Sequence, residues 1–206
     1  FWVVVTPFVA TAIGLVYAIL IDKAKFESFA KALIFLPMAI SFVGASIIWK
    51  FVYEYRPDQE GVSQIGLLNQ LLVLVGIPPQ QWLIETPWNT VFLVIVMIWI
   101  QAGFAMVLLS AAIKAVPTET LEAARLDGAG EGAIFFRIVI PQIRTTLITV
   151  FITVLIGVLK TFDVVYVMTN GNFNTNIIAV DFFNQLFTNR NNGYAAAIVV
   201  MLLIAM

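Results

Sequence analysis

Long apolar runs separated by short polar segments dominate the chain and predict membrane-spanning helices. A helix needs about 20 apolar residues to cross the hydrocarbon core of a bilayer, and four runs reach that length while a fifth is too short. The runs occupy 1–21, 32–53, 88–113, 145–166 and, from about Gly193, the rest of the chain. We therefore expect an all-α fold, a polytopic transmembrane helical bundle of five core spans with the last one truncated.

The polar segments between the runs differ in character. Residues 22–31 read as a short charged turn, whereas 54–87 and 169–192 are longer. Within the first of these longer segments, 67–75 is apolar but too short to span, so it predicts an interfacial or surface helix. Pro37 stands early in the second span, where a helix either tolerates proline or kinks.

Lysine and arginine are distributed unevenly between alternate polar segments. One set of loops, 22–31 and 114–144, holds seven of them, and the opposite set, 54–87 and 167–192, holds two. Positively charged residues favour the cytoplasmic side of a membrane protein, so we expect the first set to be cytoplasmic. The seven are Lys23, Lys25, Lys31, Lys114, Arg125, Arg137 and Arg144, against Arg56 and Arg190.

The stretch 117–141 is charged although it lies between two apolar runs. Pro117-Thr118 signals a helix start at which the Thr118 side chain can cap a free N–H, and Glu119 and Glu122 fit the first turn. Gly128 can end the helix in the left-handed conformation, and a second helical segment from about Glu131 leads into the fourth span. The residues alone leave two readings open, a helix that docks into a groove on another protein and an ordinary surface turn.

Composition narrows the classes of function. The chain is 61% hydrophobic and 11% charged, with a mean hydropathy of +0.98, which is typical of an integral membrane protein. A net charge of −1 argues against a nucleic-acid partner. The absence of Cys and His removes thiol nucleophiles, imidazole bases and the usual zinc ligands, and no nucleotide-binding glycine loop occurs. We expect no enzyme activity and no cofactor bound by this chain.

A few polar side chains fall inside the predicted spans or beside them. Lys160, Asp163 and Tyr166 are spaced to share one helical face, which could line a path for a solute or hold a structural ion pair. Gln101 in the third span reads as a pore donor or an interhelical hydrogen bond. Weaker candidates for the solute path are Asn184 and Gln185. Four glycines predict close helix packing: Gly14, Gly44, Gly103 and Gly157.

The charged stretch resembles a known family. The residues Glu122-Ala123-Ala124, Asp127-Gly128-Ala129, Ile138 and Pro141 are similar to the EAA loop of binding-protein-dependent ABC importer permeases. Segments at 103–117, 161–171 and 192–196 resemble other landmarks of the sugar-importing branch, nearest to maltose and α-glucoside permeases. The chain departs from the pattern at Thr145, where a second proline is common, and at Gly171-Asn172-Phe173, where a GGP turn is expected.

The resemblance implies a permease domain over 1–206, truncated at both ends, with a cytoplasmic coupling loop at 114–144. Its helix would insert into a cleft of a separate ATPase, where Glu122 would pair with a basic group. The residues that the resemblance assigns to ATPase coupling are Glu122, Ala123, Ala124, Arg125, Asp127, Gly128, Ala129 and Pro141.

The implied partners are ABC ATPase subunits carrying ATP and Mg, a second permease subunit, a periplasmic or lipid-anchored solute-binding protein, a sugar, and membrane lipid. The implied location is the cytoplasmic (inner) membrane of a bacterium or archaeon. Two alternatives remain: a permease for another solute, such as glycerol phosphate or an amino acid, and a secondary transporter. The latter would need ion-coupling carboxylates within its spans, and only Asp163 is available.

Overall fold

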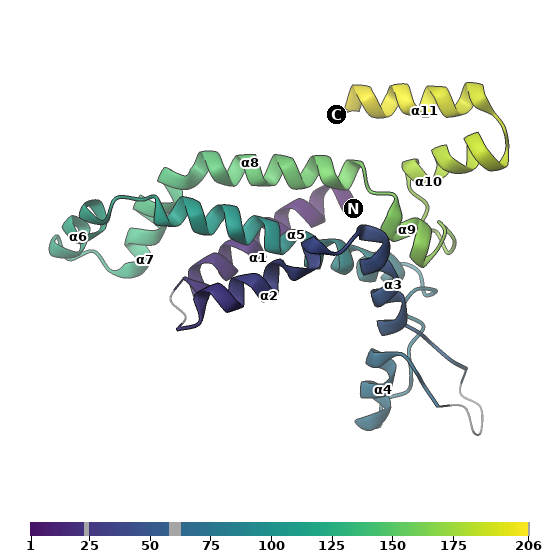
Figure 1. Cartoon of the computed structure of the whole chain (residues 1–206), viewed down its shortest axis with the longest axis horizontal. Helices are drawn as coiled ribbons and strands as arrows, with labels where there is room; N and C mark the ends of the chain where they lie inside the picture. The colour runs from purple at the N-terminus through teal and green to yellow at the C-terminus, as the bar shows by residue number, and fades with distance from the viewer. Residues whose placement is uncertain (23–24, 58–62, 206) are drawn as a thin grey trace. The chain divides into compact units, whose positions relative to one another are not determined.

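The computed structural model describes residues 1–22, 25–57 and 63–205, and all regular structure within these ranges is helical (Figure 1). Lys23 lies outside the described residues. The helices are α1 Trp2–Ile21, α2 Glu27–Ala39, α3 Phe42–Val52, α4 Leu67–Leu74, α5 Trp88–Lys114, α6 Thr118–Leu126, α7 Glu131–Ile134, the π-helix η1 Phe135–Val139, α8 Ile140–Leu159, α9 Asp163–Met168, α10 Ile178–Phe183, the π-helix η2 Asn184–Thr188 and α11 Asn192–Ala205.

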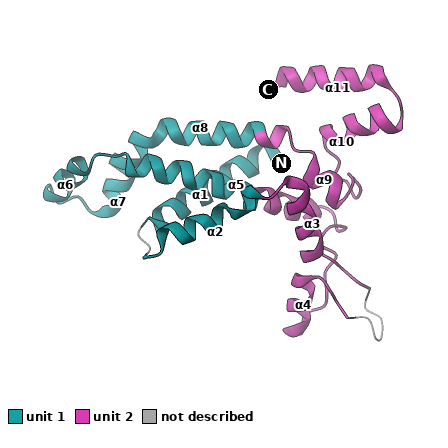
Figure 2. Ribbon diagram, viewed as in Figure 1, with its two compact units in different colours: residues 1–39, 98–156 teal, residues 40–97, 157–206 magenta. Residues whose placement is uncertain are grey.

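The chain forms two compact units, coloured separately in Figure 2. Unit 1 comprises residues 1–39 and 98–156, and therefore holds α1, α2, most of α5, and the helices from α6 to most of α8. Unit 2 comprises residues 40–97 and 157–206, with α3, α4 and α9 to α11. Each unit joins segments that are far apart in the sequence.

Three helical segments among the described residues are long and apolar enough to cross a membrane: Trp2–Ile21, Trp88–Lys114 and Glu131–Leu159. The first and third predicted spans are thus confirmed. α11 is apolar but has only 14 residues, fewer than a helix needs to cross a bilayer. The predicted helix at 67–75 is confirmed as α4, and the predicted polar segment 169–192 contains α10 and η2.

The prediction of one continuous second span over 32–53 was wrong. The structure has two helices there, α2 and α3, and α2 already begins at Glu27, inside the predicted charged turn. Pro37 lies within α2 and cannot donate a backbone hydrogen bond. Two residues after α2 ends, the Ser41 side chain accepts a hydrogen bond from the Gly44 N–H at 3.1 Å and so caps α3. The break arises because Pro37 weakens the end of α2 and the Ser41 cap then favours the start of a new helix.

The boundaries predicted for the fourth span also differ from the structure. Helix is continuous from Glu131, because α7, η1 and α8 follow one another directly. The wide π-turn precedes Pro141, whose ring would clash with a carbonyl of a regular α-turn. The helix ends at Leu159, not at 166 as predicted. At this observed end the Thr161 hydroxyl donates a hydrogen bond to the Gly157 carbonyl at 3.2 Å. Such a bond competes with the helical ladder.

Two of the four predicted packing glycines bring helices of unit 1 together. A Cβ on Gly14 would overlap the Cβ of Ala105, and a Cβ on Gly103 would overlap the backbone carbonyl of Ile34. α1 and α2 therefore both approach α5 at positions where only a hydrogen fits. Gly44 differs, since its nearest neighbours are Ile40 and Ser41, just before α3. The role predicted for Gly157 stays a prediction.

Candidate functional site

α6 carries most of the predicted coupling residues on an exposed element. It spans Thr118–Leu126, nine residues, with Glu119 in its first turn. Two details differ from the prediction: the N-cap is Pro117 without any side-chain cap bond, so Thr118 does not cap the helix, and Glu122 lies beyond the first turn. Pro117 occupies the cap position with φ −58° and ψ 129°, and its ring has no oxygen that could accept a hydrogen bond from the first turn.

The helix ends in a backbone cap centred on Gly128. Gly128 has φ +83° and its N–H donates to the Arg125 carbonyl at 3.0 Å, while the Ala129 N–H donates to the Ala124 carbonyl at 3.0 Å. These two bonds with a left-handed residue between them form a Schellman motif. The predicted glycine stop is confirmed, and the Asp127-Gly128-Ala129 sequence is the local reason for it.

One face of α6 packs on unit 1 while the other faces outward. Leu121, Ala124 and Ala129 are half-buried and contact a cluster of buried apolar side chains, namely Val116, Ile134, Val139 and Ile143. Glu122 and Ala123 are exposed, and Leu126 is 89% exposed. An apolar side chain that is left so open at the tip of a well-anchored helix is a feature of protein contact sites.

Arg125 stabilises the turn after α6. Its Nε donates to Glu131 Oε1 at 2.7 Å and its second guanidinium nitrogen to Oε2 at 3.2 Å, a two-point contact between residues six positions apart. The hydrogen bonds to the Glu131 carboxylate raise the pKa of the Arg125 guanidinium above its usual value. Arg125 thus makes an intramolecular contact. Pro141, the most distant predicted coupling residue, is exposed in the first turn of α8.

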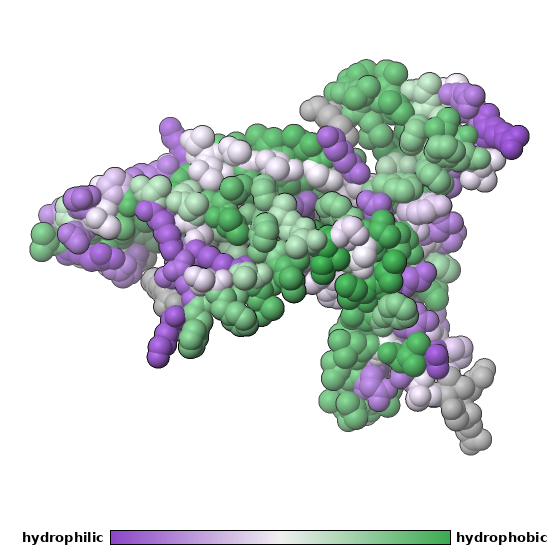
Figure 3. Space-filling model, in the orientation of Figure 1, coloured by the Kyte–Doolittle hydropathy of each residue, from purple (hydrophilic) through white to green (hydrophobic). Residues whose placement is uncertain are grey.

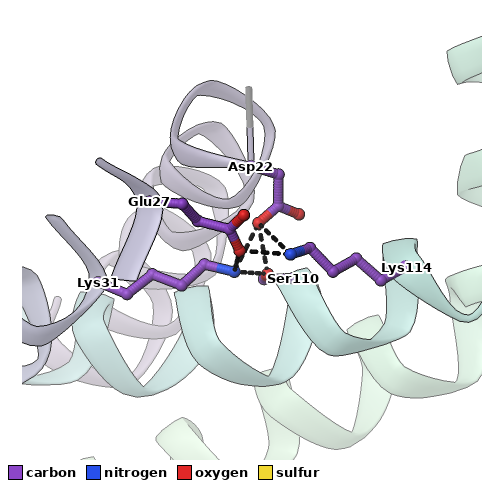
Figure 4. Close-up of polar contacts among 5 residues, drawn as sticks. All are labelled: Asp22, Glu27, Lys31, Ser110 and Lys114. Carbon is purple, nitrogen blue, oxygen red and sulfur yellow. Dashed lines mark hydrogen bonds and ion pairs between the residues drawn. The ribbon is translucent and has the colours of Figure 1, made fainter. Parts of the chain in front are cut away.

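A polar cluster in unit 1 was not predicted from the sequence. Figure 4 shows Lys31 and Lys114 approaching the carboxylates of Asp22 and Glu27 from opposite sides, with Ser110 between them. Lys31 Nζ lies 2.6 Å from Asp22 Oδ1 and 2.7 Å from Glu27 Oε1, and Lys114 also pairs with Glu27.

Ser110 completes the cluster from α5. Its hydroxyl donates to Asp22 Oδ1 at 2.7 Å and accepts from Lys31. The cluster therefore joins the end of α1, the start of α2 and the last turns of α5. Asp22 also lines a cavity of about 360 Å³, which continues along Arg125, Glu131 and the apolar residues Ile19, Ile113, Leu121, Ile134, Phe135 and Val139. The same carboxylate thus borders both the cluster and the base of α6.

Unit 2 contains a second cavity, of about 220 Å³, at the break between α8 and α9. Its lining residues are Phe42, Met97, Gly157, Lys160, Thr161, Phe162, Asp163 and Val164. Lys160 and Asp163 do border one cavity, but the prediction that they share one helical face was wrong. Lys160 lies in the break and Asp163 begins α9, and no ion pair joins these two described residues. Irregular backbone within a membrane protein is tolerated where it lines such a cavity.

The other predicted solute-path residues do not line this cavity. Tyr166 stacks on Phe162, with ring centroids 4.7 Å apart, and also contacts Phe183 at 5.0 Å. Asn184 and Gln185 are half-buried in η2, where the Gln185 side chain accepts a hydrogen bond from Asn189. Gln101 is buried in α5 and forms no hydrogen bond with another described residue. The predicted interhelical hydrogen bond of Gln101 is therefore absent among the described residues.

Comparison with known proteins gives one family. The sequence profile described as "Binding-protein-dependent transport system inner membrane component" matches residues 3–206. The chain is 50% identical over 203 residues to the osmoprotective compounds uptake permease protein GgtC of Synechocystis sp., covering 98% of this chain and 72% of that protein. It is 48% identical over 206 residues to the alpha-glucoside transport system permease protein AglF of Rhizobium meliloti, covering 98% of this chain and 61% of that protein.

A solved structure shares the fold. A bacterial alginate ABC transporter, crystallised in complex with an alginate pentasaccharide-bound periplasmic protein, contains a chain that superimposes with a TM-score of 0.83. The match covers 99% of this chain and 70% of that chain at 18% sequence identity. The predicted helical membrane architecture is thereby confirmed.

Proposed function

We propose that this chain is a permease subunit of an ATP-driven importer, because it belongs to the family of inner membrane components of binding-protein-dependent transport systems. In this role it forms half of a translocation pathway together with a second permease subunit. A separate ATPase with bound ATP and Mg supplies the energy, and a solute-binding protein delivers the solute. The 114–144 loop lies on the cytoplasmic side.

The observation that carries the coupling part of the proposal is the geometry of α6. This helix is anchored on one face by Leu121 and Ala124 and closed by Gly128, while Glu122, Ala123 and Leu126 face outward. A short helix with small side chains and an open apolar tip fits a groove on a partner. In this role the exposed carboxylate of Glu122 pairs with a basic group of the ATPase.

The test of coupling uses Gly128→Ala with Gly132→Ala as its matched control. A Cβ meets nothing within 4 Å at either position, but only Gly128 has a positive φ. Alanine in that conformation costs about 1–2 kcal/mol, a factor of roughly 5–30 in the population of the closed cap. Gly128→Pro is harsher because it also removes the N–H bonded to Arg125.

We expect Gly128→Ala to lower ATP-driven uptake and its ratio to ATP hydrolysis in proteoliposomes, and Gly128→Pro to abolish both. Gly132→Ala should leave both at the wild-type level. Wild-type uptake by the Gly128→Pro protein, inserted in normal amounts, would show that α6 does not transmit the energy of ATP.

We propose further that the imported solute is a sugar of the α-glucoside type. The name of one relative supports this, the alpha-glucoside transport system permease protein AglF. The 220 Å³ cavity supports it too, because Lys160, Asp163 and Thr161 provide hydrogen-bonding groups beside the Phe162 ring. Such a mixture of polar groups and an apolar face is what a sugar-sized ligand requires.

The test of this cavity compares Asp163→Asn with Asp181→Asn. Asp181 is also half-buried and lies in the first turn of a short helix, but it does not line the cavity. Asp163→Asn should raise the KM for uptake of a labelled α-glucoside roughly 10- to 150-fold, since loss of a hydrogen bond to a charged group costs about 1.5–3 kcal/mol. Equal KM values for the two variants would exclude Asp163 from the solute path.

A further inference from the structure

The segment that contains α4 carries no charge over 24 consecutive residues, from Gly61 to Ile84. A helix of eight residues is much too short to cross a bilayer. Of the neighbouring helices, α5 has the length and apolar character of a span, and α3 has them only together with α2, across a bend of 100°. α4 therefore lies in a connection that leaves a membrane and returns to it.

α4 is held firmly in place from one side by Asn69. This residue is fully buried, and its amide donates to the Glu54 carbonyl at 2.9 Å and to the Gln80 carbonyl at 3.0 Å. Its oxygen accepts from the Gln80 N–H at 2.8 Å and from the Trp82 indole at 3.0 Å. Four hydrogen bonds to one amide fix which face of α4 points inward.

The opposite face is apolar and open. Leu67, Leu71 and Leu74 follow one another at helical spacing and are 57%, 51% and 73% exposed, and Val75 beside them is 70% exposed. Figure 3 shows this hydrophobic surface over α4. At the edge of the stripe, Gln70 lines a cleft together with Ser63, Gln64, Val73, Gly76, Ile77, Pro78 and Pro79.

Aromatic side chains stand beside this helix. Trp82 packs edge-on against Phe92, with centroids 4.9 Å apart, and lies near Tyr53 at 6.3 Å. Tyr53 is buried within the unit, but Trp82 is half-buried, and Trp is favoured at the boundary between lipid and water. α3 also presents exposed apolar side chains, namely Ile47, Ile48 and Phe51.

We propose that the stripe formed by Leu67, Leu71 and Leu74 lies in the headgroup boundary of the lipid bilayer, so that α4 is an interfacial anchor. Lipid is the occupant that the chemistry selects, because a protein partner would find no charged group on this segment for orientation. An apolar helix face at a membrane surface is instead buried among the acyl chains. The four hydrogen bonds of Asn69 then hold α4 in the orientation that turns the leucines toward lipid.

The experiment exploits the absence of cysteine from this sequence. Nitroxide labels are attached to Leu71→Cys and Leu74→Cys in the assembled transporter, in nanodiscs of phosphatidylethanolamine and phosphatidylglycerol. Ser63→Cys is the matched control, because Ser63 is exposed in the same charge-free segment but lies outside α4, beside Gln64 and Gln70 in the cleft. Collision rates with oxygen, which concentrates in lipid, are compared with those of a water-soluble nickel complex.

We expect oxygen to be favoured at positions 71 and 74 and the nickel complex at position 63, with and without the solute-binding protein. Equal preference for nickel at 63 and 74 would overturn the proposal, since the stripe would then face water. Shielding from both reagents at 71 and 74 would also overturn it in favour of a protein partner. If that shielding required the solute-binding protein, it would identify the partner.

Discussion

Asp22 and Lys31 show how single charged side chains are accommodated at the edge of an apolar unit. Their side chains are only 13% and 21% exposed, and they lie 2.6 Å apart with Ser110 bridging them. A half-buried charge is tolerated because it is paired. Removing one partner of such a pair therefore lowers the stability more than removing one partner of an exposed pair. The role of the pair is to fix α1 and α2 against α5.

We therefore expect Lys31→Met to destabilise the protein by about 1–3 kcal/mol, since it leaves two carboxylates with fewer cationic partners. The measurement is thermal unfolding in detergent. Lys25→Met is the control, because Lys25 is exposed and has no ion pair within the described part of the chain. The double variant Asp22→Asn with Lys31→Met should lose less stability than the two single variants lose together. If its loss equalled their sum, the two residues would not be coupled.

At the scale of elements, hydropathy predicted where apolar helices lie but not where they break. Both breaks contain signals of another kind: Pro37 followed by Ser41, and Gly157 followed by Thr161. These residues act through backbone hydrogen bonds, which a count of apolar residues over a window does not register. The end of α6 was predictable, because a glycine just after a helix is itself a sequence signal. It adopts the left-handed conformation that ends the helix.

Close packing of α2 on α5 is the element-scale feature most open to a test. Gly103→Ala places a Cβ against the Ile34 backbone, which cannot move like a flexible side chain, so we expect a loss of about 1–3 kcal/mol in stability. Gly193→Ala, which meets nothing within 4 Å in α11, is the control in the same thermal unfolding measurement. Equal melting temperatures would mean that α2 shifts freely.

For the whole molecule, the distribution of Lys and Arg predicts which way the chain is inserted. The polar cluster was beyond such reasoning, because Asp22 and Ser110 are 88 positions apart and meet only when α1 and α5 pack in one register. The cavity beside Lys160 and Asp163 was partly predictable. Lys160 and Asp163 were conspicuous as charges in an apolar run, whereas Phe42 and Met97 reach the cavity through tertiary structure.

The insertion prediction is tested with Leu126→Cys and Ser63→Cys, both exposed positions. A membrane-impermeant maleimide should label position 63 in right-side-out vesicles and position 126 only in inside-out vesicles, because the Lys- and Arg-rich loops stay in the cytoplasm. The ATPase subunit should protect position 126 from labelling. The reverse pattern of labelling would mean that the charged loop is external.

The cap at Gly128 has a consequence for how fast and how tightly a partner is bound. Because backbone bonds within the chain close α6 and its inner face is already packed, the helix exists before any partner arrives. Ordering a free segment costs about 1 kcal/mol or more per residue, so the nine residues of α6 would otherwise lose roughly 10 kcal/mol of binding free energy. A preorganised helix spares that entropy, and it moves as a rigid body when it is pushed.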